Sequence, residues 1–179
     1  MLRFDLILIK YLWKLIGFTY KFKKMETGST IFENIWLADD DKDDRDIFED
    51  AVKQILPNVS ITTISGGGEL MGLLSAGKVP DILFLDINMP CKNGFDCLKE
   101  IRNARQFLKL PIVIFSSSHN HKDIDTSYGY GANLFYSKPS SFSDLIAGLS
   151  NLLVMDWSDP YTITSNHYVN HKFIAFKSH

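Results

Sequence analysis

Residues 83–90 read LFLDINMP, and this stretch decides the fold. The apolar run from Ile82 to Leu85 is typical of a buried strand, and it ends abruptly at Asp86. Pro90 prevents the strand from continuing, because proline has no backbone N–H to donate to a sheet. The pattern therefore predicts a carboxylate at the C-terminal tip of a buried strand, where open parallel sheets place their chemistry.

Around this stretch, short apolar runs alternate with amphipathic segments. Such alternation predicts βαβ units, which build a parallel sheet covered by helices on both faces. We expect an α/β, flavodoxin-like, doubly wound fold with five parallel strands in the order 2-1-3-4-5. The expected strands are residues 34–38, 59–64, 81–85, 111–115 and 132–136, and the expected helices are residues 44–56, a segment from the glycines 66–68 to residue 76, and residues 94–104, 122–129 and 142–153.

In the first expected helix, periodicity separates an apolar face from an acidic one. The apolar face, which we expect to be buried, holds Ile47, Ala51, Ile55 and Leu56. The acidic residues near its start, Asp43, Asp44 and Asp46, are expected to lie on the surface.

The composition of the 179 residues, 45% hydrophobic and 22% charged, is typical of a globular protein with one substantial core. Six of the 19 Lys and Arg residues, but one of the 21 Asp and Glu residues, lie within residues 1–24, so the rest of the chain is acidic. An acidic body lacks the basic face that direct nucleic-acid binding requires. Cys91 and Cys97 do not suggest a disulfide framework, which fits a cytoplasmic protein.

Residues 1–32 form an expected N-terminal extension, of which residues 1–24 are apolar and aromatic with interspersed basic side chains. Three interpretations of this segment stay open: a gene-model extension before a true start at Met25, an interfacial amphipathic helix, or a membrane span. Asp5, Lys10 and Lys14 interrupt the apolar run and disfavour the span. No membrane partner is expected unless residues 1–24 are made.

Polar side chains stand at the ends of four expected strands. Asp39 and Asp40 follow the first strand, Asp86 the third, Ser116 the fourth and Lys138 the fifth. In the order 2-1-3-4-5 the first and third strands are neighbours, so the three carboxylates converge at one edge. Converging carboxylates need a compensating cation, and Mg²⁺ suits a site with few carboxylates and several waters. The set predicts a phosphoryl-transfer site that forms an aspartyl phosphate on Asp86.

Four motifs, in this order, resemble the receiver domain of two-component response regulators. They are WLADD at residues 36–40, LFLDINMP at 83–90, IVIFSS at 112–117 and the pair Lys138-Pro139. The resemblance covers about residues 33–154, which we expect to form the receiver domain. It is specific, because four separated motifs agree in spacing and in structural context.

The resemblance implies how the acidic residues act. Asp86 matches the phospho-acceptor of the family. Asp39 and Asp40 match the acidic pair that holds Mg²⁺, with Asp40 the more direct ligand. Asn88 matches the position whose backbone carbonyl completes the metal shell.

It also implies a switch. Ser116 matches the switch hydroxyl that turns toward the phosphoryl group, and Lys138 matches the lysine that pairs with it. Phe135 occupies the position of the mobile aromatic residue, which is more often tyrosine in the family.

The function implied is that of a stand-alone response regulator in a two-component phosphorelay. It takes a phosphoryl group from a histidine kinase or a histidine phosphotransfer protein and then changes its binding to a downstream protein partner. It is a signalling switch and not an enzyme, with at most weak self-phosphorylation and autodephosphorylation. The alternative is a phosphorylation-independent, receiver-like interaction module. A phosphohydrolase of the haloacid dehalogenase type is disfavoured, because Asn88 stands where such enzymes need a second aspartate.

Residues 155–179 form an expected C-terminal tail. This tail is too short for a DNA-binding or catalytic output domain, so we expect the output to be a protein partner. Its polar and aromatic composition leaves two interpretations open: a disordered or loosely packed extension, or a segment that binds a partner or forms a dimer.

Overall fold

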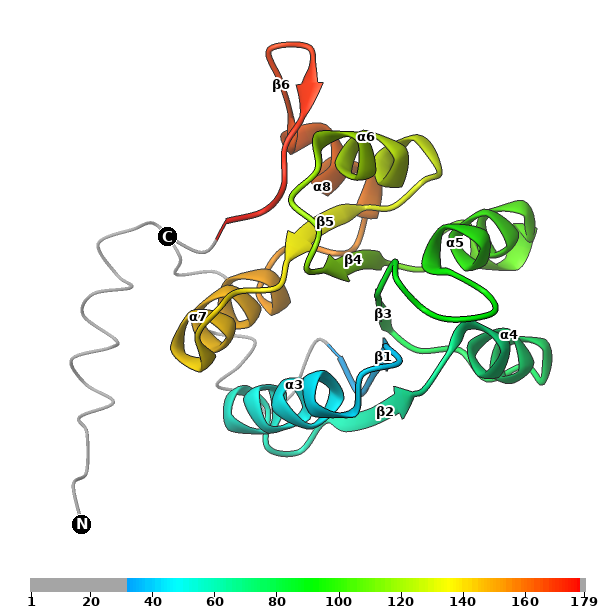
Figure 1. The fold of residues 1–179 in the computed structure, drawn as a ribbon, viewed down its shortest axis with the longest axis vertical. Coiled ribbons are helices and arrows are strands. Elements are labelled where there is room, and N and C mark those ends of the chain that lie inside the picture. The colour runs from blue at the N-terminus through cyan, green and yellow to red at the C-terminus, as the bar shows by residue number, and fades with distance from the viewer. Residues whose placement is uncertain (1–31, 178–179) are drawn as a thin grey trace. The chain divides into compact units, whose positions relative to one another are not determined.

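The computed structural model describes residues 32–177, and the expectations for residues 1–24 lie outside them. The described part has a five-stranded parallel sheet in the order β2-β1-β3-β4-β5 (Figure 1), which confirms the predicted fold. Each strand lies within two residues of its predicted bounds, at β1 (Asn34–Ala38), β2 (Ser60–Ile64), β3 (Ile82–Leu85), β4 (Ile112–Ser116) and β5 (Leu134–Ser137). Within residues 32–177 no helix is both long and apolar enough to cross a membrane.

Helices cover both faces of the sheet. One face packs against α3 (Lys42–Ile55) and α7 (Phe142–Leu153), and the other against α4 (Gly67–Ser75), α5 (Gly94–Asn103) and α6 (His121–Gly129) (Figure 1). A single 3₁₀ turn, η1 (Arg105–Phe107), lies between α5 and β4. The layers are those of a doubly wound fold.

The core is divided by the sheet into two apolar clusters. Along β3, Leu83 and Leu85 belong to the cluster under α4, α5 and α6, whereas Ile82 and Phe84 belong to the cluster under α3 and α7. Successive side chains of a strand point to opposite faces, and a parallel sheet buries both. This explains why the four residues before Asp86 are all apolar.

The start of α3 is fixed by Asp41, whose carboxylate accepts hydrogen bonds from the backbone N–H groups of Asp43 and Asp44. The predicted buried face is wrong at one position, because Ile47 is 46% exposed. Phe48 takes its place: it lies three and four residues before Ala51 and Val52, and all three are buried.

The C-terminal segment, defined here as Trp157–Lys177, is folded onto the domain. It consists of α8 (Pro160–Asn166), a hairpin of β6 (Tyr168–Val169) and β7 (Lys172–Phe173), and a final stretch along the edge of β5. Trp157 and Ile163 are buried in the cluster under α3 and α7. The interpretation of this tail as a disordered or loosely packed extension is therefore wrong.

Candidate functional site

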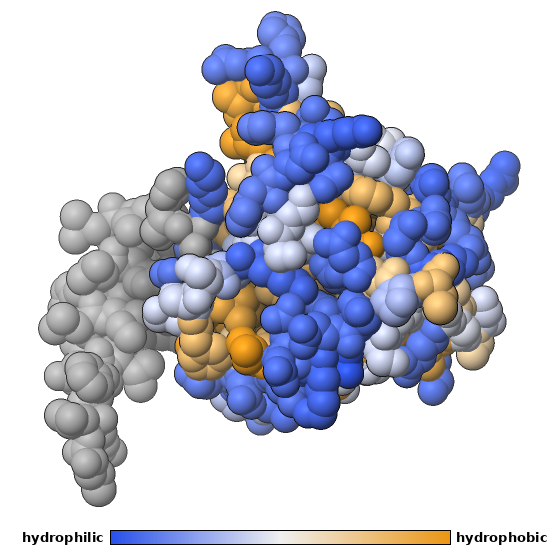
Figure 2. All heavy atoms as spheres, in the orientation of Figure 1, coloured by the Kyte–Doolittle hydropathy of each residue, from blue (hydrophilic) through white to orange (hydrophobic). Residues whose placement is uncertain are grey.

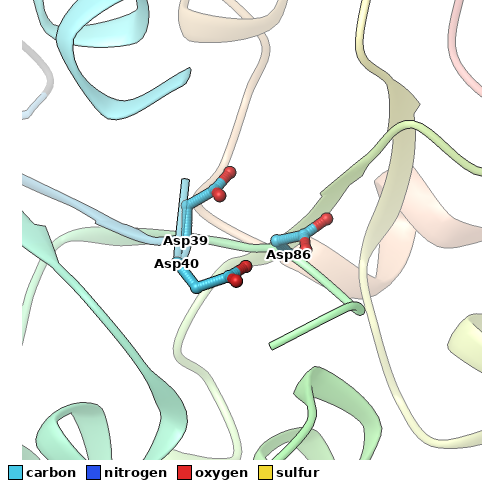
Figure 3. A group of neighbouring side chains, drawn as sticks. All are labelled: Asp39, Asp40 and Asp86. Carbon is cyan, nitrogen blue, oxygen red and sulfur yellow. The ribbon is translucent and has the colours of Figure 1, made fainter. Parts of the chain in front are cut away.

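The pairing of β1 with β3 brings the predicted carboxylates together. Ala38 and Leu85 are partners in the register, so Asp39 and Asp86 leave the two strands side by side. The Asp86 N–H still donates to the Ala38 carbonyl at 2.9 Å, which continues the sheet for one more residue. One carboxylate oxygen each from Asp39, Asp40 and Asp86 lies within 4.8 Å of the others (Figure 3).

Two of these carboxylates are almost fully buried, with Asp39 1% and Asp86 3% exposed, while Asp40 is exposed. The Asp86 Oδ2 atom accepts a hydrogen bond from the Asn88 N–H at 2.8 Å. The Asp86 Oδ1 atom is buried and has no hydrogen-bond partner among residues 32–177. Because an unsatisfied buried carboxylate oxygen is costly, this atom is suited to receive a ligand.

The donor set fits a hard divalent cation. Mg²⁺ prefers carboxylate and carbonyl oxygens and keeps some of its own waters, so a site needs few protein ligands and an open side. Asp40 provides the open side because it is exposed. Burial raises the pKa of Asp39 above its ordinary value, although hydrogen bonding to the Lys138 ammonium acts against this. A cation among the carboxylates would offset the same burial cost.

Lys138, which follows β5, reaches the same place. Its Nζ atom lies 2.7 Å from Asp39 Oδ2, 2.7 Å from Asp44 Oδ2 and 3.7 Å from Asp86 Oδ1. Burial lowers the pKa of the Lys138 ammonium, but the hydrogen bonds to Asp39 and Asp44, together with the negative charges of Asp86 and Asp39, outweigh burial, and the net shift of the pKa is upward. The lysine therefore stays charged at neutral pH.

Sequence reasoning missed Asp44, which it assigned to the surface. The Asp44 side chain is 41% exposed, yet its carboxylate contacts Lys138 across 94 positions of the chain. A weak indication was present in the sequence, because Asp44 lies only four and five residues after Asp40 and Asp39, which follow β1.

The two predicted switch residues lie on neighbouring strands. Ser116 ends β4 and is fully buried, and its Oγ atom accepts a hydrogen bond from the Ser118 N–H at 3.4 Å. Phe135 in β5 is fully buried in the cluster under α4, α5 and α6. Its carbonyl accepts a hydrogen bond from the Phe176 N–H at 2.7 Å, which ties this strand to the C-terminal segment.

Comparison with known proteins gives one family. The family model of the response regulator receiver domain matches residues 35–150. Among curated proteins, the response regulator Rcp1 of Synechocystis sp. is 26% identical over 62% of this chain and 80% of Rcp1. The DNA-binding transcriptional regulator NtrC of Salmonella typhimurium is 32% identical over 63% of this chain, which corresponds to 23% of NtrC.

Solved structures agree. The Mn²⁺-bound form of Rcp1 superimposes with a TM-score of 0.62 and 25% identity over 67% of this chain and 91% of that one. The phosphorylated cyanobacterial phytochrome response regulator RcpA superimposes with a TM-score of 0.63 and 28% identity over 67% of this chain and 90% of that one. Both neighbours have the same fold as the domain described here.

Proposed function

We propose that this chain, which belongs to the response regulator receiver domain family, is a switch of a two-component phosphorelay that accepts a phosphoryl group on Asp86. One observation carries the proposal: the buried Asp86 Oδ1 atom lacks a hydrogen-bond partner among residues 32–177 and faces the Lys138 ammonium at 3.7 Å. A carboxylate with one free oxygen beside a positive charge is a prepared nucleophile. The cytoplasm, where such relays operate, is its proposed compartment.

In the proposed reaction, an Asp86 carboxylate oxygen forms a bond to phosphorus while the P–N bond of a donor phosphohistidine breaks. The leaving imidazole nitrogen keeps the bonding electron pair and takes a proton from solvent. Asp39, Asp40, Asp86 and the backbone carbonyl of Asn88 would hold Mg²⁺, which supplies positive charge to the phosphoryl oxygens when bound. Lys138 supplies a second positive charge, and Ser116 is the proposed hydroxyl donor at the end of β4.

The donor is proposed to be a histidine kinase or a histidine phosphotransfer protein. Two cavities lie near the carboxyl edge of β5. The first, of about 690 Å³, lies beside α6 and is not lined by Lys138. The second, of about 510 Å³, lies between α3 and α7 and is lined by Lys138, so it is the better candidate for the donor. At the rim of the second cavity, Ile47 is 46% and Phe142 40% exposed. Figure 2 shows hydrophobic residues between the hydrophilic side chains of these two helices. Exposed apolar side chains in the cavity that Lys138 lines suit a docked protein donor.

The output is proposed to pass through Ser116 and Phe135 to the surface formed by α6, β5 and α7. Phe135 is buried beneath α6, and its backbone carbonyl bonds to Phe176. A downstream partner that reads this surface would therefore also contact the C-terminal segment. The domain is proposed to act by protein binding and not as an enzyme, with at most weak self-phosphorylation and autodephosphorylation.

The test is incubation of the full chain with acetyl phosphate and Mg²⁺, followed by intact mass spectrometry. We expect a gain of one phosphoryl group, which is lost in Asp86→Asn and in the presence of EDTA. Absence of the gain in the wild type, with Mg²⁺ binding retained, would instead support the alternative of a phosphorylation-independent interaction module.

A further inference from the structure

The Lys138 ammonium is bound unevenly by the carboxylates around it. An ammonium group has three hydrogen-bond donors, and two of them are engaged at 2.7 Å by Asp39 and Asp44. Asp86 Oδ1, the atom that needs a donor, is a full ångström farther away at 3.7 Å. The lysine is thus held back from the group that it is proposed to serve.

The two close carboxylates differ in what else they do. Asp39 is buried and belongs to the carboxylate cluster that fits a cation, so it has a second use. Asp44 lies outside that cluster, in the first turn of α3, and is 41% exposed. Its backbone N–H donates to the carboxylate of Asp41, the N-cap of α3, at 3.4 Å.

We propose that Asp44 is a positioning residue that holds Lys138 in its resting place and thereby opposes the phosphorylated state. This inference rests on the proposed function of Asp86. A phosphoryl group on Asp86 must draw the ammonium toward itself, and Asp44 competes for the same ammonium with a full negative charge. The Asp44 carboxylate also repels the added negative charge directly.

The test is the affinity of the full chain for beryllofluoride, which mimics the phosphoryl group on an aspartate, at saturating Mg²⁺ by titration calorimetry. Asp44→Asn keeps the shape of the side chain and removes its charge. We expect it to bind beryllofluoride about three- to tenfold more tightly than the wild type, because the lost charge is partly exposed and partly screened. Asp44→Glu keeps the negative charge and is expected to bind beryllofluoride with the affinity of the wild type.

The matched control is Asp50→Asn. Asp50 belongs to the same helix and lines the same cavity as Asp44 and Lys138, so the two variants lose the same charge from the same element. Its beryllofluoride affinity is expected to stay within about twofold of the wild type. The melting temperature and the affinity for Mg²⁺ alone are measured for both variants, because a merely structural role of Asp44 would lower stability and weaken both ligands together.

The outcomes separate the inference from the function on which it rests. If the wild type binds beryllofluoride and Asp44→Asn binds it no more tightly than Asp50→Asn, Asp44 does not restrain the lysine and the inference is overturned. If the wild type neither binds beryllofluoride nor gains a phosphoryl group, the proposed function is overturned, and the inference with it.

Discussion

The carboxyl edge of the sheet and the C-terminal segment both bury side chains, but the buried groups differ in kind. At the edge, Asp39 and Asp86 are at most 3% exposed, and Asp86 Oδ1 has no hydrogen-bond partner in the described part of the chain. In the C-terminal segment, Trp157 and Ile163 fill an apolar cluster, and the Trp157 indole N–H donates to the Leu152 carbonyl at 3.0 Å.

This difference has a physical meaning. Burial of apolar area and of satisfied N–H groups stabilises a fold, whereas burial of an unsatisfied carboxylate costs free energy that a ligand can return. The edge is therefore the part of the domain that we propose binds a ligand, and the C-terminal segment packs apolar side chains into the core. Substitutions in the two regions should separate stability from phosphoryl uptake.

The largest effect is expected for Trp157→Ala. Removing this buried indole should lower the free energy of unfolding by about 3 kcal/mol, because it leaves a cavity in the cluster under α3 and α7. Urea unfolding measures the loss, and phosphoryl uptake should persist at temperatures where the variant is folded. The control is Tyr168→Ala, since Tyr168 is 50% exposed and should cost about 1 kcal/mol or less. An unchanged stability of Trp157→Ala would contradict the packing role of the segment.

Tyr128→Phe should have the next largest effect, because the Tyr128 hydroxyl joins the C-terminal segment to β5. It accepts a hydrogen bond from the Phe135 N–H at 3.1 Å and donates one to the Ile174 carbonyl at 3.0 Å. Without it the buried Phe135 N–H has no partner, so we expect a loss of about 2 kcal/mol in the free energy of unfolding.

The control for this variant is Tyr130→Phe, which removes the hydroxyl of a residue that is 39% exposed and should be nearly neutral. Hydrogen exchange of the Phe135 amide gives a local measurement, and it should become faster in Tyr128→Phe alone. Equal losses of stability in the two variants would show that the hydroxyl does not join the two regions.

The fold could be predicted because its elements carry the periodicities that secondary structure imposes. Five short strand-like runs define a parallel sheet, and the polar residues that follow four of them, Asp39 and Asp86 included, come to one edge. The C-terminal segment carries no such pattern. Its helix α8 has seven residues and its strands two each, which is too short for a period to show.

Periodicity also could not determine which apolar side chain of α3 is buried, or which residue Asp44 contacts. Ile47 and Phe48 are adjacent and both apolar, so either could face the core after a small rotation of the helix. Phe48 is the buried one because its ring packs against those of Phe84 and Phe115. The partner of Asp44 depends on where Lys138 arrives from the far end of the domain. No local pattern contains that information.

Asp41→Ala tests whether an acidic residue beside Asp39 and Asp86 can stabilise the fold, and its effect on stability should be smaller than that of Tyr128→Phe. Asp41 caps α3, so its loss should lower the free energy of unfolding by about 1 kcal/mol. The control is Asn93→Ala, because Asn93 caps α5 in the same way by accepting from the Asp96 N–H at 2.9 Å. Similar losses in thermal unfolding would separate capping acids from the buried pair, whereas a gain in stability for Asp41→Ala would contradict the cap.

Asp86→Asn should have the smallest effect on stability, and it tests most directly whether the carboxyl edge differs from the C-terminal segment. The substitution removes a buried charge and keeps the shape of the side chain, so in Mg²⁺-free buffer the free energy of unfolding should be unchanged or higher by about 1 kcal/mol. Adding Mg²⁺ should stabilise the wild type more than the variant, since a ligand stabilises the state that binds it. Both are read from urea unfolding with and without Mg²⁺. A clear loss of stability in Mg²⁺-free Asp86→Asn would mean that Asp86 holds the fold together as Trp157 does, and the distinction between the two regions would fail.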